Sequence, residues 1–205
     1  ETVIHSGEPD ASGFMMELAD LNKDGRIDIL TQITGGGIIW LEHPVDRTSR
    51  WPIHEIGTVA PDHANALTLV DINNDGRLDL ITGGYSDDPR TREPEHISPQ
   101  DSCGRLAWFE QTTDPKAAWV RHDISRRRRG MFDAFAAVDV NRDGLVDFIA
   151  TRGNSGNYDG VLGLEQVRTD KPAAAFTQAR EKDSPEVALP KDAGSDGQAG
   201  DRGSR

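Results

Sequence analysis

The sequence predicts an all-β protein built from repeated four-stranded antiparallel sheets. A nine-residue motif rich in Asp occurs three times, at residues 20–28, 71–79 and 139–147. Short apolar segments rich in β-branched residues flank each copy, as strands do. Aromatic residues then recur at fixed places after the first two copies. Together these observations predict repeats that each contain one loop of this motif between two adjacent strands.

The motif itself indicates a cation loop. Each copy has oxygen-bearing side chains at positions 1, 3, 5 and 9 and Gly at position 6. Calcium takes about six to eight oxygen ligands, and Gly permits the sharp turn around the ion. We therefore predict about three structural calcium ions, each also bound by the backbone carbonyl of position 7. The predicted ligands are Asp20, Asn22, Asp24, Arg26 and Asp28, then Asp71, Asn73, Asp75, Arg77 and Asp79, then Asp139, Asn141, Asp143, Leu145 and Asp147. A hairpin turn rich in Asp and Asn, without an ion, is the alternative.

An EF-hand is a second alternative, and two features argue against it. That motif requires Glu at loop position 12 and a helix on each side. Position 12 is here Thr31, Thr82 and Ala150. The flanking segments also alternate like strands, so we expect a strand on each side of the loop.

Four strands per repeat describe the blade of a β-propeller, so the expected fold is a propeller or a fragment of one. We expect residues 1–13 to hold an outer strand of a preceding blade and a link. Blades follow at 14–60, at 61–125 with an insertion at 85–103, and at 126–180 with a degenerate last strand. Residues 181–205 contain too little apolar surface to fold, and we expect a disordered tail or linker there.

These loops and strands resemble the FG-GAP, or VCBS, repeats of integrin-α-type propellers, over roughly residues 1–168. The resemblance implies a calcium-binding propeller of an extracellular, cell-surface or periplasmic protein. It does not imply one activity, because such repeats occur in adhesion receptors, lectin-like modules and some polysaccharide-active enzymes. The third copy departs from the pattern at Gly163, where the others have Trp40 and Trp108.

Composition and blade number limit the partners. The net charge of −12 argues against nucleic acid, and no apolar run has transmembrane length. Three blades are fewer than the usual range of about four to eight. We therefore expect the remaining blades of a longer chain as partners, with a ring of two copies as the alternative.

The face opposite the loops contains the other candidate residues. An anionic ligand could bind there by charge and by forked hydrogen bonds from arginine. A Tyr and a His near a bound uronate could also act as acid and base in a lyase-type elimination. The candidates are His63, Tyr85, His96, Arg126, Arg127, Arg128 and Arg129. Ordinary solvated surface is the alternative for all of them.

Other recurring residues have a structural interpretation. His5, His54 and His122 occupy equivalent outer-strand positions, and Trp40, Trp51, Trp108 and Trp119 are expected to pack between blades. The predicted function is accordingly a calcium-stabilised, non-catalytic module for extracellular binding of protein or of acidic or neutral polysaccharide. The alternative is part of a secreted, lyase-like enzyme with its site on the face opposite the loops.

Overall fold

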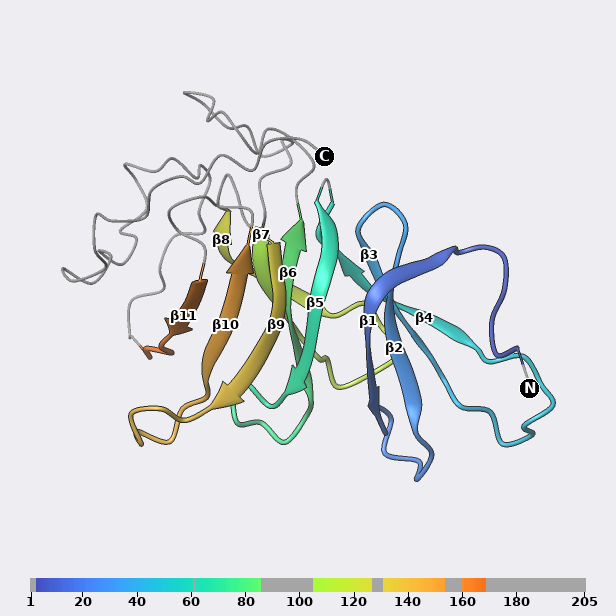
Figure 1. Cartoon of the computed structure of the whole chain (residues 1–205). Coiled ribbons are helices and arrows are strands. Elements are labelled where there is room, and N and C mark those ends of the chain that lie inside the picture. Colours follow the sequence, from blue (N-terminus) through green and yellow to red (C-terminus); the bar gives the residue numbers. More distant parts are fainter. Residues whose placement is uncertain (1–2, 61, 86–104, 127–130, 154–159, 169–205) are drawn as a thin grey trace, which may run out of the picture.

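The computed structural model describes residues 3–60, 62–85, 105–126, 131–153 and 160–168. They form antiparallel strands that fall into three repeats, and no helix occurs in these ranges (Figure 1). Repeat one consists of β1 (Ala11–Ala19), β2 (Asp28–Ile33), β3 (Gly37–Leu41) and β4 (Ile53–Thr58). Repeat two consists of β5 (His63–Val70), β6 (Asp79–Tyr85), β7 (Arg105–Glu110) and β8 (Val120–Arg126). Repeat three consists of β9 (Met131–Val138), β10 (Asp147–Gly153) and β11 (Gly160–Leu164).

The three motif loops join the first two strands of their repeats in the same register. Ala19 pairs with Asp28, Val70 pairs with Asp79, and Val138 pairs with Asp147. The Asp at position 9 therefore opens the second strand of each repeat, opposite the last residue of the first strand. Figure 1 shows all three loops at the same, lower edge of the molecule.

The repeats lie side by side. Repeat one is a separate sheet of order β1-β2-β3-β4. Repeats two and three share one sheet, in which β6 meets β9 only through the pair Tyr85–Met131. Within the described ranges the repeats form a row that does not close into a ring (Figure 1).

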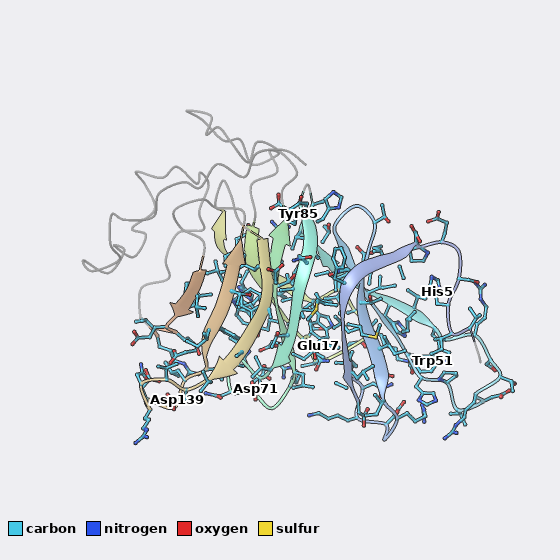
Figure 2. The ribbon with its side chains drawn as sticks, viewed as in Figure 1. His5, Glu17, Trp51, Asp71, Tyr85 and Asp139 are labelled. Atoms are coloured by element: carbon cyan, nitrogen blue, oxygen red, sulfur yellow. The ribbon has the colours of Figure 1, made fainter. Side chains whose placement is uncertain are left out.

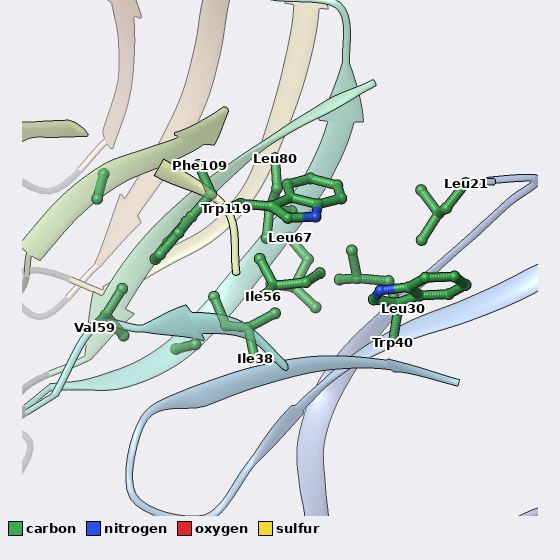
Figure 3. Close-up of a cluster of buried hydrophobic side chains, with 12 residues drawn as sticks. Leu21, Leu30, Ile38, Trp40, Ile56, Val59, Leu67, Leu80, Phe109 and Trp119 are labelled. Atoms are coloured by element: carbon green, nitrogen blue, oxygen red, sulfur yellow. The ribbon is translucent and has the colours of Figure 1, made fainter. Parts of the chain in front are cut away.

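Apolar side chains pack between successive repeats. Leu30 and Trp40 of repeat one are fully buried against Leu67, Phe109 and Trp119 of repeat two (Figure 3). A second cluster joins repeats two and three, with Ile81 and Leu106 on one side and Phe132, Phe135 and Phe148 on the other. The prediction that Trp40 packs between repeats is thus confirmed.

The outer face of repeat one has no neighbouring repeat in the described structure. Met16 and Leu18 are 62% and 60% exposed, whereas Leu67, the counterpart of Met16 in repeat two, is 1% exposed. The far face of repeat three also leaves Val161 73% exposed. The same repeat positions are therefore buried inside the row and exposed at its two ends.

Two expectations about repeat one differ from the structure. The strand expected around His5 does not form, because residues 3–10 have no neighbouring strand to pair with, and the His5 ring bonds instead to the Pro9 carbonyl at 2.8 Å. Trp51 does not pack between repeats: its ring stacks on His43, with the centroids 4.5 Å apart. Its counterpart Trp119 is buried, because repeat one covers it. Figure 2 shows Trp51 on the side of repeat one away from repeat two.

Several expected segments lie outside the part of the chain that the structure describes. They are most of the insertion 85–103, the last strand of the third blade and the tail 181–205.

Candidate metal loops

The three loops share one backbone conformation. Position 4 has a positive φ in each loop, of 59° at Lys23, 62° at Asn74 and 65° at Arg142. Position 6 is Gly at φ 83° to 85° in all three. Residues with side chains can adopt the left-handed φ of position 4 but rarely adopt a φ as large as that of position 6, which explains why Gly occupies position 6.

Side-chain oxygens of the loop turn inward onto its own backbone. Asp20 accepts hydrogen bonds from the N–H groups of Asp24 and Gly25, at 2.9 and 2.8 Å. Asn22 Oδ1 accepts from the Asp24 N–H at 3.1 Å, and Asp24 Oδ1 accepts from the Arg26 N–H at 2.9 Å. The other two loops repeat all four bonds at 2.8 to 3.1 Å. The oxygens of positions 1, 3 and 5 are therefore gathered around one turn.

The Asp at position 9 is buried and ties its loop to the end of the third strand. Asp28 accepts from the Leu21 N–H at 3.0 Å and from the His43 N–H at 2.9 Å. Asp79 and Asp147 make the equivalent pairs of bonds. Burial raises the pKa of Asp79 to about 6, and it raises the pKa of Asp28 as well, although the backbone donors act to lower both.

The side chain at position 7 distinguishes the loops. In loop one the Arg26 guanidinium pairs with Asp24 and donates from Nε to the His43 carbonyl at 2.8 Å. Arg77 makes the same contacts in loop two. Desolvation acts to raise the pKa of Asp24. Hydrogen bonds and the nearby Arg26 guanidinium outweigh it and hold this pKa below its ordinary value. The third loop has Leu145 here and gains no such positive charge.

The donor set of each loop fits a hard cation, because it consists of carboxylate, amide and carbonyl oxygens. Within the described ranges, however, no three acidic or histidine side chains converge on one point. The carboxylates instead bond to separate backbone N–H groups. The individual calcium ligands therefore stay predictions.

Beside each loop lies a glutamate that was not among the residues predicted from the sequence. Asn22 donates from Nδ2 to Glu42 Oε1 at 3.1 Å, Asn73 donates to Glu110 at 3.2 Å, and Asn141 donates to Glu165 at 2.8 Å. Each Glu lies at the end of the third strand of its repeat, or just after it. The recurring acid two residues after Trp40 and Trp108 was the signal that could have identified them.

Those of the other candidate residues that the structure describes lie at the opposite edge. His63 and Tyr85 face each other as a cross-strand pair of β5 and β6. Arg126 ends β8 and pairs with Arg105 of β7. Figure 2 shows Tyr85 at the end of the sheet away from Asp71 and Asp139. The structure therefore brings His63 and Tyr85 together, while His96 and Arg127–Arg129 lie outside the described residues.

Comparison with known families supports the repeat assignment. Residues 20–82, from the first loop to the middle of β6, match the FG-GAP-like repeat family. The chain therefore contains an FG-GAP-like repeat. Residues 132–148 match the EF hand family. That segment is a loop between strands β9 and β10, so its likeness to an EF-hand lies in the loop and not in flanking helices.

A search of curated proteins found no match to the sequence. No helix long and apolar enough to cross a membrane occurs among the described residues.

Proposed function

We propose that this chain is a calcium-stabilised β-propeller module that binds an extracellular ligand without catalysis. The observation that carries the proposal is the threefold recurrence of one loop, with the same four inward hydrogen bonds and the same strand register. The FG-GAP-like and EF hand matches both include such loops, which supports calcium as the cation.

Calcium would act structurally in this proposal. Three carboxylates and an amide oxygen crowd each loop, and like charges at short range repel one another. A bound cation would neutralise that repulsion and hold the first two strands of the repeat together. Loops of this kind in extracellular modules fill at millimolar calcium, so we propose an extracellular, cell-surface or periplasmic location.

The open faces of repeats one and three support further blades as partners. Met16 occupies a position whose counterparts, Leu67 and Phe135, are buried between repeats elsewhere in the row, and Leu18 beside it is also exposed. Exposed apolar sheet faces of this kind favour association. We propose that the remaining blades of a longer chain cover them, with a second copy of this chain as the alternative.

The ligand of this module would bind at the edge opposite the loops. His63 is exposed there and lies opposite the half-buried Tyr85, and Arg126 ends a strand of the same repeat. Loops and strand ends on a rigid scaffold are where binding sites usually lie. A protein or an acidic or neutral polysaccharide is the proposed ligand.

The pairing of His63 with Tyr85 also favours a second candidate, a polysaccharide lyase. One of the two side chains would remove the proton next to the uronate carboxyl, and the other would protonate the leaving oxygen. Polymers of uronic acids separate the two candidates. Binding without unsaturated product supports the module. Unsaturated product that is lost in His63→Ala and in Tyr85→Phe supports the enzyme. Absence of both binding and product, with a protein partner captured in calcium, assigns the surface to adhesion.

A further inference from the structure

We propose that Glu42 and Glu110 are positioning residues for calcium: each fixes the amide of the loop's position-3 asparagine so that its oxygen faces the ion. This inference rests on the proposed calcium binding. An asparagine amide presents an acceptor at one end and two N–H donors at the other. Only the oxygen end can ligate a cation, so an amide that turns freely is a poorer ligand.

In loop one the contacts select the required orientation. Asn22 Nδ2 donates to Glu42 Oε1 at 3.1 Å and to Asp24 Oδ2 at 2.9 Å. Asn22 Oδ1 meanwhile faces the turn, where it accepts from the Asp24 N–H at 3.1 Å. An ionised carboxylate accepts hydrogen bonds and cannot donate them, so Glu42 holds the nitrogen end of the amide away from the turn.

Two neighbours hold Glu42 itself in place. His54 Nε2 lies 2.7 Å from Glu42 Oε2, and Lys116 Nζ of repeat two lies 2.8 Å from the same oxygen. The His54 ring packs against the buried Trp40, with the centroids 4.4 Å apart. Glu42 is therefore held in one position.

Loop two repeats the arrangement with different residues. Asn73 Nδ2 donates to Glu110 Oε1 at 3.2 Å, and His122 Nε2 lies 2.9 Å from Glu110 Oε2. The His122 ring stacks on Trp108 at a centroid distance of 4.2 Å. The same chain of contacts, from Trp through His and Glu to the position-3 Asn, therefore ends at the loop in both repeats.

Within the described residues, loop three retains only the first contact. Asn141 donates to Glu165 at 2.8 Å, but Gly163 replaces the tryptophan. No histidine occurs anywhere in the sequence after His122, so Glu165 has no such ring to hold it. Glu165 is also exposed, whereas Glu42 is half-buried. We therefore restrict the inference to the first two loops.

The experiment is a calcium titration of the whole chain in which nitrogen–proton NMR spectra are recorded at each calcium concentration. The backbone amides of Gly25, Gly76 and Gly144 each donate to the position-1 Asp of their own loop, so their resonances report the three loops separately. Removal of a second-layer partner of a metal ligand typically costs about 10- to 100-fold in affinity. We expect Glu42→Ala to raise the calcium dissociation constant at Gly25 about tenfold, with Gly76 and Gly144 unchanged. Glu55→Ala, at an exposed position of β4, is the matched control and should change none of them.

A double-mutant cycle separates positioning from a loss of packing. A carboxylate at position 3 offers oxygen at both ends, so Asn22→Asp removes the need for orientation. In the Asn22→Asp background, Glu42→Ala should therefore not weaken calcium binding at Gly25. A tenfold loss that persists in that background overturns the inference, as does wild-type affinity in Glu42→Ala. If none of the three glycines responds to calcium in the wild-type chain, the proposed calcium binding itself is wrong.

Discussion

Lys23 in the first loop donates a hydrogen bond from Nζ to the backbone carbonyl of Gly76 in the second loop, at 2.9 Å. Asn74, the equivalent residue of the second loop, donates to the carbonyl of Gly144 in the third loop at 3.4 Å. Gln111 of repeat two adds a bond from Nε2 to the Leu21 carbonyl at 3.1 Å. The three loops thus form a connected row along one edge, and Gln111 also anchors the first loop to the repeat that follows it.

The contact between Lys23 and Gly76 predicts a small coupling between loops. Lys23→Met keeps most of the stem but removes the donor, and an exposed bond of this kind is worth about 0.5–1 kcal/mol. We expect the free energy of unfolding, measured by urea denaturation, to fall by that amount. Arg142→Met is the control, because Arg142 holds position 4 in the third loop and makes no such bond to another loop in the described structure. Equal effects of the two substitutions would contradict the coupling.

The positive φ of Gly25 predicts a backbone-specific cost. An added Cβ would meet no atom within 4 Å, so any loss of stability in Gly25→Ala comes from the angle of 85° and not from a clash. Left-handed angles cost residues with a Cβ about 1–2 kcal/mol. Urea denaturation should show that loss in Gly25→Ala. Gly153→Ala, which also has open space but lacks a positive φ, should unfold like the wild type.

Close packing at Gly57 predicts that a substitution in repeat two can restore part of the stability lost by a substitution in repeat one. A Cβ at this position would lie 2.6 Å from Cε1 of the buried Phe109. Overpacking of this kind costs about 1–3 kcal/mol, so Gly57→Ala should lower the melting temperature. Adding Phe109→Leu removes the clashing ring edge. The double variant should therefore lose less stability than the sum of the two single variants, and simple additivity would show that Gly57 does not limit this interface.

The raised pKa of Asp79 predicts a proton linkage in loop two. In the calcium-free protein the folded state keeps this proton more tightly than the unfolded chain does. The protonated Asp79 carboxyl therefore stabilises the folded state fully at pH values below the ordinary aspartate pKa of 3.8. This stabilisation is lost as pH rises through about 6. Calcium binding instead favours the ionised form of Asp79, because a carboxylate that binds a metal must be ionised.

Carbon NMR of the Asp79 carboxyl measures this linkage. We expect a titration midpoint near 6 in chelator and a lower midpoint in saturating calcium. Calcium affinity read at Gly76 should also weaken as pH falls below that midpoint. A midpoint that calcium does not move would remove Asp79 from the ligands.

The sequence was sufficient to place each loop between two strands, because the motif and its flanking strand patterns are local features. It was also sufficient to predict that Trp40 packs between repeats, because repeat two covers the face of repeat one on which Trp40 lies. It could not separate Trp51 from Trp119, since equivalent residues differ only in whether another repeat covers them.

The glutamate contacts escaped prediction for a different reason. The separation between the position-3 Asn and its Glu is 20, 37 and 24 residues in the three repeats, so no fixed spacing marks the pair. The contact between loops was equally hidden, because position 4 is Lys, Asn and Arg in turn. Only the three-dimensional arrangement of the repeats brings these groups together.

The most direct test of calcium stabilisation is thermal unfolding in calcium and in chelator. With calcium at about 100 times its dissociation constant, each independent site adds roughly 2.7 kcal/mol. For a chain of this size that corresponds to a rise in melting temperature of about 5–10 °C for a single site. A variant with Asp24→Asn, Asp75→Asn and Asp143→Asn replaces one predicted carboxylate ligand of each loop with a neutral amide and should lose most of this rise. A wild-type melting temperature that is the same in calcium and in chelator would contradict the account.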